Sequence, residues 1–274
     1  MALPRTGCPK CDYNGFRITE GKLETCECII RRRLHTVYEG IGIPRVLYDA
    51  RLEQYAIKND GKPNGSTELD KGLSRAKEEA RDWFSSYLDQ MAAVFTNDEN
   101  FQFSDPGKDH WQGRTIILCG NRGSGKSLLA VCVAKRAIEL RLPPKIIQWA
   151  DVIESCYDFD REDDENSFSG MAGKLASAQP IIIENFSMNY ETRRHPTDSG
   201  GSGGLNPVTR RRLDSLFSKV YQKGLVTVLT TSHSVTSLEE QDAYGPLFSS
   251  IISDAYKRWL PSPMDTQKNT KKGT

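Results

Sequence analysis

Short, nearly continuous apolar runs recur along the chain from residue 115 onward. They cover residues 115–119, 145–149, 180–185 and 225–233, and a helix followed by a strand is expected within 247–260. Runs of this length are typical of strands that a parallel sheet buries on both faces. Between consecutive strands, helices are expected to begin near residues 128, 150 and 213. This alternation predicts an α/β domain with a parallel sheet flanked by helices.

A longer helical pattern precedes this domain. Apolar side chains at helical spacing between Ala76 and Phe95 predict an amphipathic helix over residues 74–95, packed on the core of the α/β domain. Turn-forming residues at 58–66 indicate a linker before this helix. The expected organisation is a small N-terminal region (1–38), a connecting segment (39–110), the α/β domain (111–262) and a disordered basic tail (263–274).

The first apolar run leads directly into a phosphate-binding motif. The motif reads Gly120-Asn121-Arg122-Gly123-Ser124-Gly125-Lys126-Ser127 and fits G-x-x-x-x-G-K-[ST]. Its glycines permit the backbone dihedrals that aim N–H groups at a phosphate, and the helix that follows presents its N-terminus to the anion. Lys126 is expected to reach the β- and γ-phosphates, and Ser127 to complete a Mg²⁺ shell. Because strand, loop and helix follow in the required order, we expect ATP and Mg²⁺ binding rather than a chance glycine-rich turn.

A second apolar strand ends in the acid Glu184, which is expected to hold Mg²⁺ beside the loop, through water. In ATPases of this layout the next residue is usually an acid that polarises the attacking water. Here it is Asn185, which can hydrogen-bond a water but cannot accept its proton. We therefore predict a weak ATPase (ATP and water to ADP and phosphate) in which an acid at position 185 would raise turnover. At the end of the last apolar run, Ser232 or His233 is the candidate γ-phosphate sensor.

Four of the seven cysteines lie in two close pairs, Cys8 with Cys11 and Cys26 with Cys28. Two such pairs can bring four thiolates to one tetrahedral Zn²⁺, and the segment between them predicts two short strands. Zinc fits a reducing cytosol better than disulfides do. Two alternatives stay open: His35 replacing one ligand, and redox use of the C-x-x-C pair, although no thioredoxin-like pattern surrounds it.

The formal net charge is only +1, so any nucleic-acid surface must be local. Two arginine-rich segments are candidates, residues 31–33 and the glycine-containing stretch 188–212, which is predicted to be a mobile cationic loop. Either could contact DNA phosphates, or could be a solvated helix face and a linker. No apolar run approaches the roughly 20 residues that span a bilayer, and the N-terminus lacks a secretory signal, so a cytoplasmic protein is expected.

The order of these features resembles the DnaC-like helicase loaders, which are AAA+ ATPases related to the IstB-type transposition helpers. The likeness extends over about residues 8–260 and rests on the cysteine pairs followed by three arginines, on Ile43-Pro44-Arg45 with Tyr48-Asp49-Ala50, on the phosphate-binding loop and on a strand ending Thr-Thr-Ser. The resemblance implies a P-loop AAA+ domain preceded by a zinc-bearing N-terminal region. It also implies a protein of a bacterium or phage that loads a hexameric replicative helicase onto single-stranded DNA, with assembly into a homo-oligomer.

The chain departs from that family at two places. One is Asn185, and the other is residues 248–254, where the family carries arginines that act in trans or as a sensor and this chain has none. Lys257 and Arg258 lie just beyond and are candidate replacements. Since an arginine finger speeds phosphoryl transfer by orders of magnitude, ATP is expected to act as an assembly switch with slow hydrolysis. The alternatives are an IstB-like transposition helper and a nucleotide-gated adaptor with negligible hydrolysis.

Overall fold

The chain divides into two compact units, the first ending at Ala50 and the second beginning at Arg51. The computed structural model describes residues 8, 10–11, 15–55, 68–95, 115–157, 167–187, 207–222, 226–239, 250–253 and 255–262. The predicted linker at 58–66, the polar stretch before the phosphate-binding loop, the acidic run at 158–165 and the basic tail at 263–274 lie outside these residues. In the described part of the chain, no helix combines the length and the apolar character needed to cross a membrane.

The first unit contains a hairpin, in which β1 (Phe16–Thr19) pairs antiparallel with β2 (Lys22–Thr25). Its two-residue turn, Glu20 and Gly21, has φ values of 52° and 77°. Positive φ at both turn positions matches the right-handed twist of the strands, which explains the tight connection. The two short strands predicted between the cysteine pairs are therefore confirmed.

Helix α1 (Glu27–Ile41) follows the hairpin and ends at Gly42, whose φ of 90° forms a left-handed cap. Pro44 cannot continue the helix, and the chain turns back through the 3₁₀ turn η1 (Arg45–Leu47). Tyr48 then contacts two rings of α1, those of His35 and Tyr38, at centroid distances of 4.8 and 5.5 Å. The Ile-Pro-Arg segment thus folds against α1 within the first unit.

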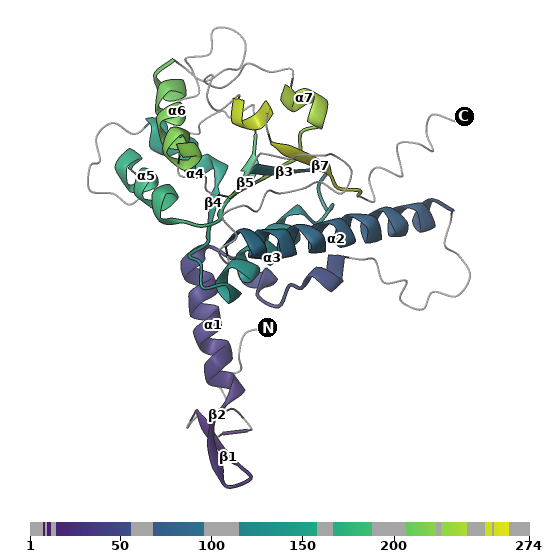
Figure 1. The fold of residues 1–274 in the computed structure, drawn as a ribbon, viewed down its shortest axis with the longest axis vertical. Coiled ribbons are helices and arrows are strands. Elements are labelled where there is room, and N and C mark those ends of the chain that lie inside the picture. The colour runs from purple at the N-terminus through teal and green to yellow at the C-terminus, as the bar shows by residue number, and fades with distance from the viewer. Residues whose placement is uncertain are drawn as a thin grey trace. The chain divides into compact units, whose positions relative to one another are not determined.

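The second unit is built on a five-stranded, fully parallel sheet (Figure 1). Its strands are β3 (Thr115–Cys119), β4 (Lys145–Gln148), β5 (Ile181–Phe186), β6 (Thr227–Thr231) and β7 (Tyr256–Trp259). They lie in the order β4-β5-β6-β3-β7, so β6 separates the strand that leads into the phosphate-binding loop from the strand that carries Glu184. The predicted α/β class with a parallel sheet is confirmed.

Helices cover both faces of this sheet. One face packs on α4 (Trp149–Tyr157), α5 (Phe168–Ser177) and α6 (Pro207–Gln222) through a single apolar core that includes Ile117, Ile183 and Leu229. Because side chains alternate along a strand, the neighbouring strand residues point to the other face, where α3 (Lys126–Glu139) lies beside α2 (Glu68–Phe95) (Figure 1). The short helix α7 (Val235–Glu239) follows β6.

Two helices differ from their predicted bounds. Helix α2 begins at Glu68 rather than at residue 74, and α6 begins at Pro207 rather than at residue 213. Proline is well suited to the first position of a helix because its fixed φ is helical and its missing N–H would have no partner there. Consequently Arg210, Arg211 and Arg212 lie in a helix, and the prediction of a mobile loop reaching residue 212 is wrong for this part.

Candidate functional site

The phosphate-binding loop joins β3 to α3 at the carboxyl edge of the sheet. The Gly120 N–H donates to Thr231 O of β6 at 3.2 Å, and Leu260 N donates to Cys119 O at 2.7 Å, so the strands on both sides hold the start of the loop. A Cβ at Gly120 would lie 2.7 Å from Leu260 O. This close backbone approach requires glycine at the first position of the motif.

Lys126 is folded into the loop that it follows. Its Nζ donates to Gly120 O at 2.6 Å and to Asn121 O at 3.0 Å, and lies 3.4 Å from Ser124 Oγ. Burial lowers the pKa of Lys126, because the ammonium has lost water without gaining an acid. A bound phosphate would supply the negative charge that this ammonium does not meet among the described residues. Ser127 follows in the first turn of α3 and is half-buried, as the motif requires of a Mg²⁺ ligand.

Tyr55, at the end of the 3₁₀ turn η2 (Leu52–Tyr55), packs on the last glycine of the loop. A Cβ at Gly125, whose φ is 94°, would lie 2.6 Å from Tyr55 Cε2. The Tyr55 ring is 3% exposed, and Lys77 of α2 places its Nζ 5.2 Å from the ring centroid. Among the described residues, Tyr55 Oη has no hydrogen-bond partner. The ring is therefore wedged between α2 and the loop and leaves no room for a side chain at Gly125.

Gly125→Ala is expected to destabilise the second unit by at least about 2 kcal/mol, because alanine disfavours a left-handed φ and its Cβ would strike a buried ring. Unfolding in urea measures the effect. Gly173→Ala in α5 is the control: apart from its chain neighbours and the backbone of its own helix, no atom of the structure lies within 4 Å of the added Cβ, so it should be neutral or stabilising. Equal stabilities of the two variants would contradict the packing described here.

Glu184 stands near the end of β5, 3% exposed, paired in register with Gln148 at the end of β4. Gln148 Nε2 donates to Glu184 Oε2 at 3.2 Å, whereas the buried Oε1 has no hydrogen-bond partner within the described chain. An orphaned buried carboxylate oxygen at this edge fits a ligand of a hydrated Mg²⁺. Asn185 is exposed, with a φ of 59°, and its Nδ2 donates to Gln148 Oε1 at 2.8 Å.

The end of β6 lies between these two groups and is fixed by its threonines. Thr230 Oγ1 accepts from Asn185 N at 3.1 Å, and Thr231 Oγ1 donates to Phe186 O at 2.7 Å. Ser232 is exposed just past the strand, and the half-buried His233 has its Nε2 3.5 Å from Ser187 Oγ. Burial lowers the pKa of His233, so its ring stays neutral near pH 7. Both candidate sensors therefore follow the strand that separates the loop from Glu184.

The strand order and this site can be compared with known structures. The sequence matches no protein-family model and no curated protein. AMPPCP-bound DnaA from Aquifex aeolicus matches with a TM-score of 0.50 at 11% sequence identity, over 84% of this chain and 56% of that chain. The second unit has a P-loop AAA+ fold. The chain spans little more than half of the DnaA chain that it matches, 56% of its length.

Two smaller proteins match this AAA+ fold over most of their length. The DnaC helicase loader has 13% identity and a TM-score of 0.47, over 80% of this chain and 100% of that chain. DnaI has 12% identity and a TM-score of 0.47, over 81% of this chain and 96% of that chain. The AAA+ fold that the sequence resemblance implied is confirmed by the DnaA match.

The candidate replacements for the missing arginines both lie on β7 of the AAA+ unit. Lys257 Nζ donates to Ser253 O at 3.1 Å. The Arg258 guanidinium lies 5.5 Å from the Trp83 ring of α2, and its Nε is buried without a hydrogen-bond partner in the described chain. Each side chain contacts groups of its own unit.

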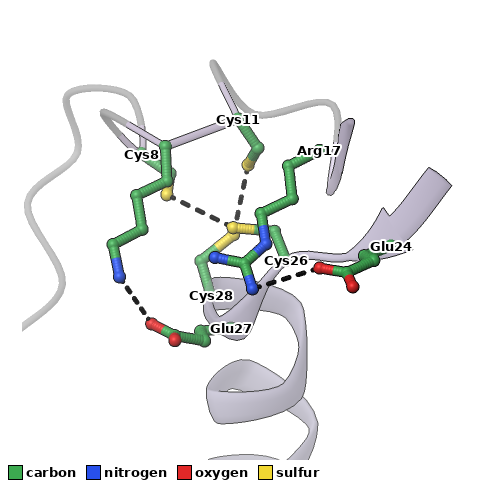
Figure 2. Close-up of polar contacts among 8 residues, drawn as sticks. Cys8, Cys11, Arg17, Glu24, Cys26, Glu27 and Cys28 are labelled. Carbon is green, nitrogen blue, oxygen red and sulfur yellow. Dashed lines mark hydrogen bonds and ion pairs between the residues drawn. The ribbon is translucent and has the colours of Figure 1, made fainter. Parts of the chain in front are cut away.

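The four cysteines of the first unit converge, with every pair of sulfurs within 4.8 Å (Figure 2). Cys8 Sγ lies 3.8 Å from Cys26 Sγ, and Cys11 Sγ lies 3.4 Å from Cys28 Sγ. Tetrahedral Zn–S bonds of about 2.3 Å place sulfurs about 3.8 Å apart, so the donor set fits zinc. His35 does not belong to this group of ligands and packs on Tyr48 instead.

The local backbone and the crowding of sulfur atoms act on the thiols in opposite directions. The Lys10 backbone N–H lowers the pKa of Cys8 to about 7, whereas hydrogen bonding to Cys11 raises the pKa of Cys28 to about 12. Four thiols this close cannot all ionise unless a cation neutralises them. Ion pairs between Lys10 and Glu27, at 2.8 Å, and between Arg17 and Glu24, at 3.3 Å, surround the cluster (Figure 2).

Sequence reasoning missed two residues of the candidate site, Tyr55 and Gln148. Gln148 lies one residue before the end of the predicted strand 145–149, and Glu184 lies near the end of another, so two polar residues near the ends of predicted parallel strands were a usable indication of their contact. Tyr55 lies far from the phosphate-binding loop in sequence, in a segment without a recognisable chemical motif, so only the tertiary fold reveals its contact with Gly125.

Proposed function

We propose that the AAA+ unit binds ATP with Mg²⁺ at the loop formed by residues 120–127. The observation that carries this proposal is the placement of Lys126 and Glu184 at the carboxyl ends of β3 and β5, with only β6 between them. Lys126 would bind the β- and γ-phosphates through its ammonium, and loop N–H groups would cradle them. Ser127 and Glu184 would hold Mg²⁺, which neutralises the charge of the transferring phosphoryl group.

Hydrolysis at this site is proposed to be slow. Asn185 can orient a water through its amide but cannot take its proton, and general-base help is typically worth about 10²–10⁴-fold in rate. Residues 248–254 contain no arginine. ATP then acts mainly as a switch that organises the protein, and hydrolysis resets the switch.

The biological role that we propose is loading of a hexameric replicative helicase onto single-stranded DNA, by a homo-oligomer in the cytoplasm of a bacterium or of a phage-infected cell. Support comes from the sequence resemblance to DnaC-like loaders and from the AAA+ fold, which DnaA, a replication initiator, shares. The zinc-binding first unit would contact the helicase. The three exposed arginines of α1, Arg31 to Arg33, offer cations for DNA or for a protein surface.

A pull-down from host lysate tests this role. The tagged chain with ATP and Mg²⁺ is expected to recover a hexameric replicative helicase, identified by mass spectrometry, and recovery should fall when Lys126→Ala replaces the wild type. Recovery of a transposase instead would favour the IstB-like alternative. Recovery of the helicase at equal yield with the Lys126→Ala variant would contradict an ATP switch and favour an adaptor.

A further inference from the structure

Gln148 links Glu184 and Asn185, two neighbouring residues of β5. It donates from Nε2 to Glu184 Oε2 at 3.2 Å and accepts at Oε1 from Asn185 Nδ2 at 2.8 Å. The pairing register places Gln148 directly opposite Glu184, so this contact is set by the sheet. The pairing of β5 with β6 shifts register between Ile183 and Phe186. Within this irregularity, the Asn185 backbone N–H donates to the Thr230 side chain, at 3.1 Å from Oγ1, instead of to a backbone carbonyl of β6.

The two ends of the Gln148 amide are not interchangeable here. An ionised Glu184 can only accept hydrogen bonds, so it selects the NH₂ end of the amide. The carbonyl end must then face position 185, and a carbonyl needs a donor. Asparagine supplies a donor, whereas an ionised aspartate would bring two acceptors together. If the Gln148 amide rotated so that its NH₂ group donated to an aspartate at position 185, its oxygen would face the Glu184 carboxylate. Two acceptors would then lie together at Glu184 instead.

We propose that Gln148 is a positioning residue whose amide, oriented by Glu184, requires a hydrogen-bond donor at position 185. This inference rests on the proposed nucleotide site. Asn185 is then the matching half of a pair rather than a missing base. Glu184 is the single carboxylate near the strand end: Gln148 holds its Oε2, and its Oε1 would be the atom that holds Mg²⁺ through water.

The proposal reverses an expectation from the sequence. The motif alone predicts that Asn185→Asp restores an acid and raises turnover. The geometry predicts that the aspartate disturbs the amide and, through it, Glu184. The backbone conformation does not bias the comparison of asparagine with aspartate, because both residues tolerate the left-handed φ of 59° found at position 185.

A double-mutant cycle tests the pair in the full chain. The four proteins are the wild type, Asn185→Asp, Gln148→Ala and the double variant. Three quantities are measured: the urea unfolding equilibrium, Mn²⁺ affinity in the presence of ADP, and kcat with KM for ATP. The new negative charge acts on the metal in both backgrounds, so its direct effect cancels in the cycle.

Asn185→Asp should lower two quantities, the folded-to-unfolded ratio and the Mn²⁺ affinity. For each, we expect the factor of the decrease to be at least three times larger beside Gln148 than in the Gln148→Ala background. With Gln148 present, kcat should fall while KM for ATP changes less than twofold, measured where the unfolding curves show all four proteins to be fully folded, so that lost stability does not contribute. A coupling below threefold in both equilibria, or a kcat that rises with Asn185→Asp beside Gln148, would overturn the proposal. If the wild type binds no nucleotide, the proposed function fails, and the unfolding cycle still decides whether the pair exists.

Discussion

Removing the metal from the four-cysteine cluster is expected to unfold the first unit and to leave the AAA+ unit folded. Apart from two of the cysteines, its buried apolar residues among those described are only Ile43 and Ala50, and α1 buries none of its side chains. A unit of this size without an apolar core depends on a metal or on cross-links for its stability. Structural zinc contributes about 10–16 kcal/mol in comparable small domains, far more than any other contact in this unit.

The Cys8→Ser, Cys26→Ser double variant makes this loss permanent. Metal analysis should find about one zinc per wild-type chain and none in the variant. Amide hydrogen exchange should show loss of protection in β1, β2 and α1 and unchanged protection in β3 and α3. Chelation of the wild type followed by added Zn²⁺ is the control, because it should remove and restore the same protection. Full zinc retention by the double variant would refute the assignment.

Lys126→Ala is expected to weaken ATP binding at least tenfold, which corresponds to about 1.4 kcal/mol. The lysine ammonium is partly desolvated and makes its described contacts with oxygens of the loop, so a phosphate gains from it an attraction that water screens poorly. Alanine removes the charge and the hydrogen bonds together. Calorimetric titration with a non-hydrolysable ATP analogue measures the affinity.

Lys135→Ala, further along α3, is the matched control because it changes the net charge equally and lies outside residues 120–127. Its affinity for the analogue should stay within twofold of the wild type. An unchanged affinity in Lys126→Ala would contradict the proposal that the loop binds the nucleotide. A similar loss in both variants would indicate a general electrostatic effect instead.

The local features of the AAA+ unit could be predicted from the sequence, because each depends on residues adjacent in the chain. The strand before Gly120 and the helix after Gly125 follow from an apolar run and a glycine-rich motif. Convergence of the cysteines also follows from their spacing. The start of α6 was missed because a glycine run and three arginines suggested a loop, and because the apolar residues that pack this helix on the sheet core, Leu213, Leu216 and Phe217, begin only at residue 213.

What the sequence could not provide depends on register and on contacts between distant residues. The role of Gln148 requires that β4 and β5 pair with Gln148 opposite Glu184, and a shift of one residue would point the two side chains to different faces. The interpretation of Asn185 as a missing acid therefore followed from the motif alone. The hydrogen bond from Asn185 to Gln148 follows only from the pairing of β4 with β5.

The ring that packs on Gly125 also affects how the two units can be studied separately. Tyr55 lies just past the border at Ala50, within the second unit. A shortened chain that starts at the amphipathic helix would keep the whole phosphate-binding sequence and still lose this packing. Weak nucleotide binding by such a fragment would invite the conclusion that the first unit regulates the ATPase. A fragment that starts at Arg51 separates the two explanations, since it lacks the first unit and keeps the ring.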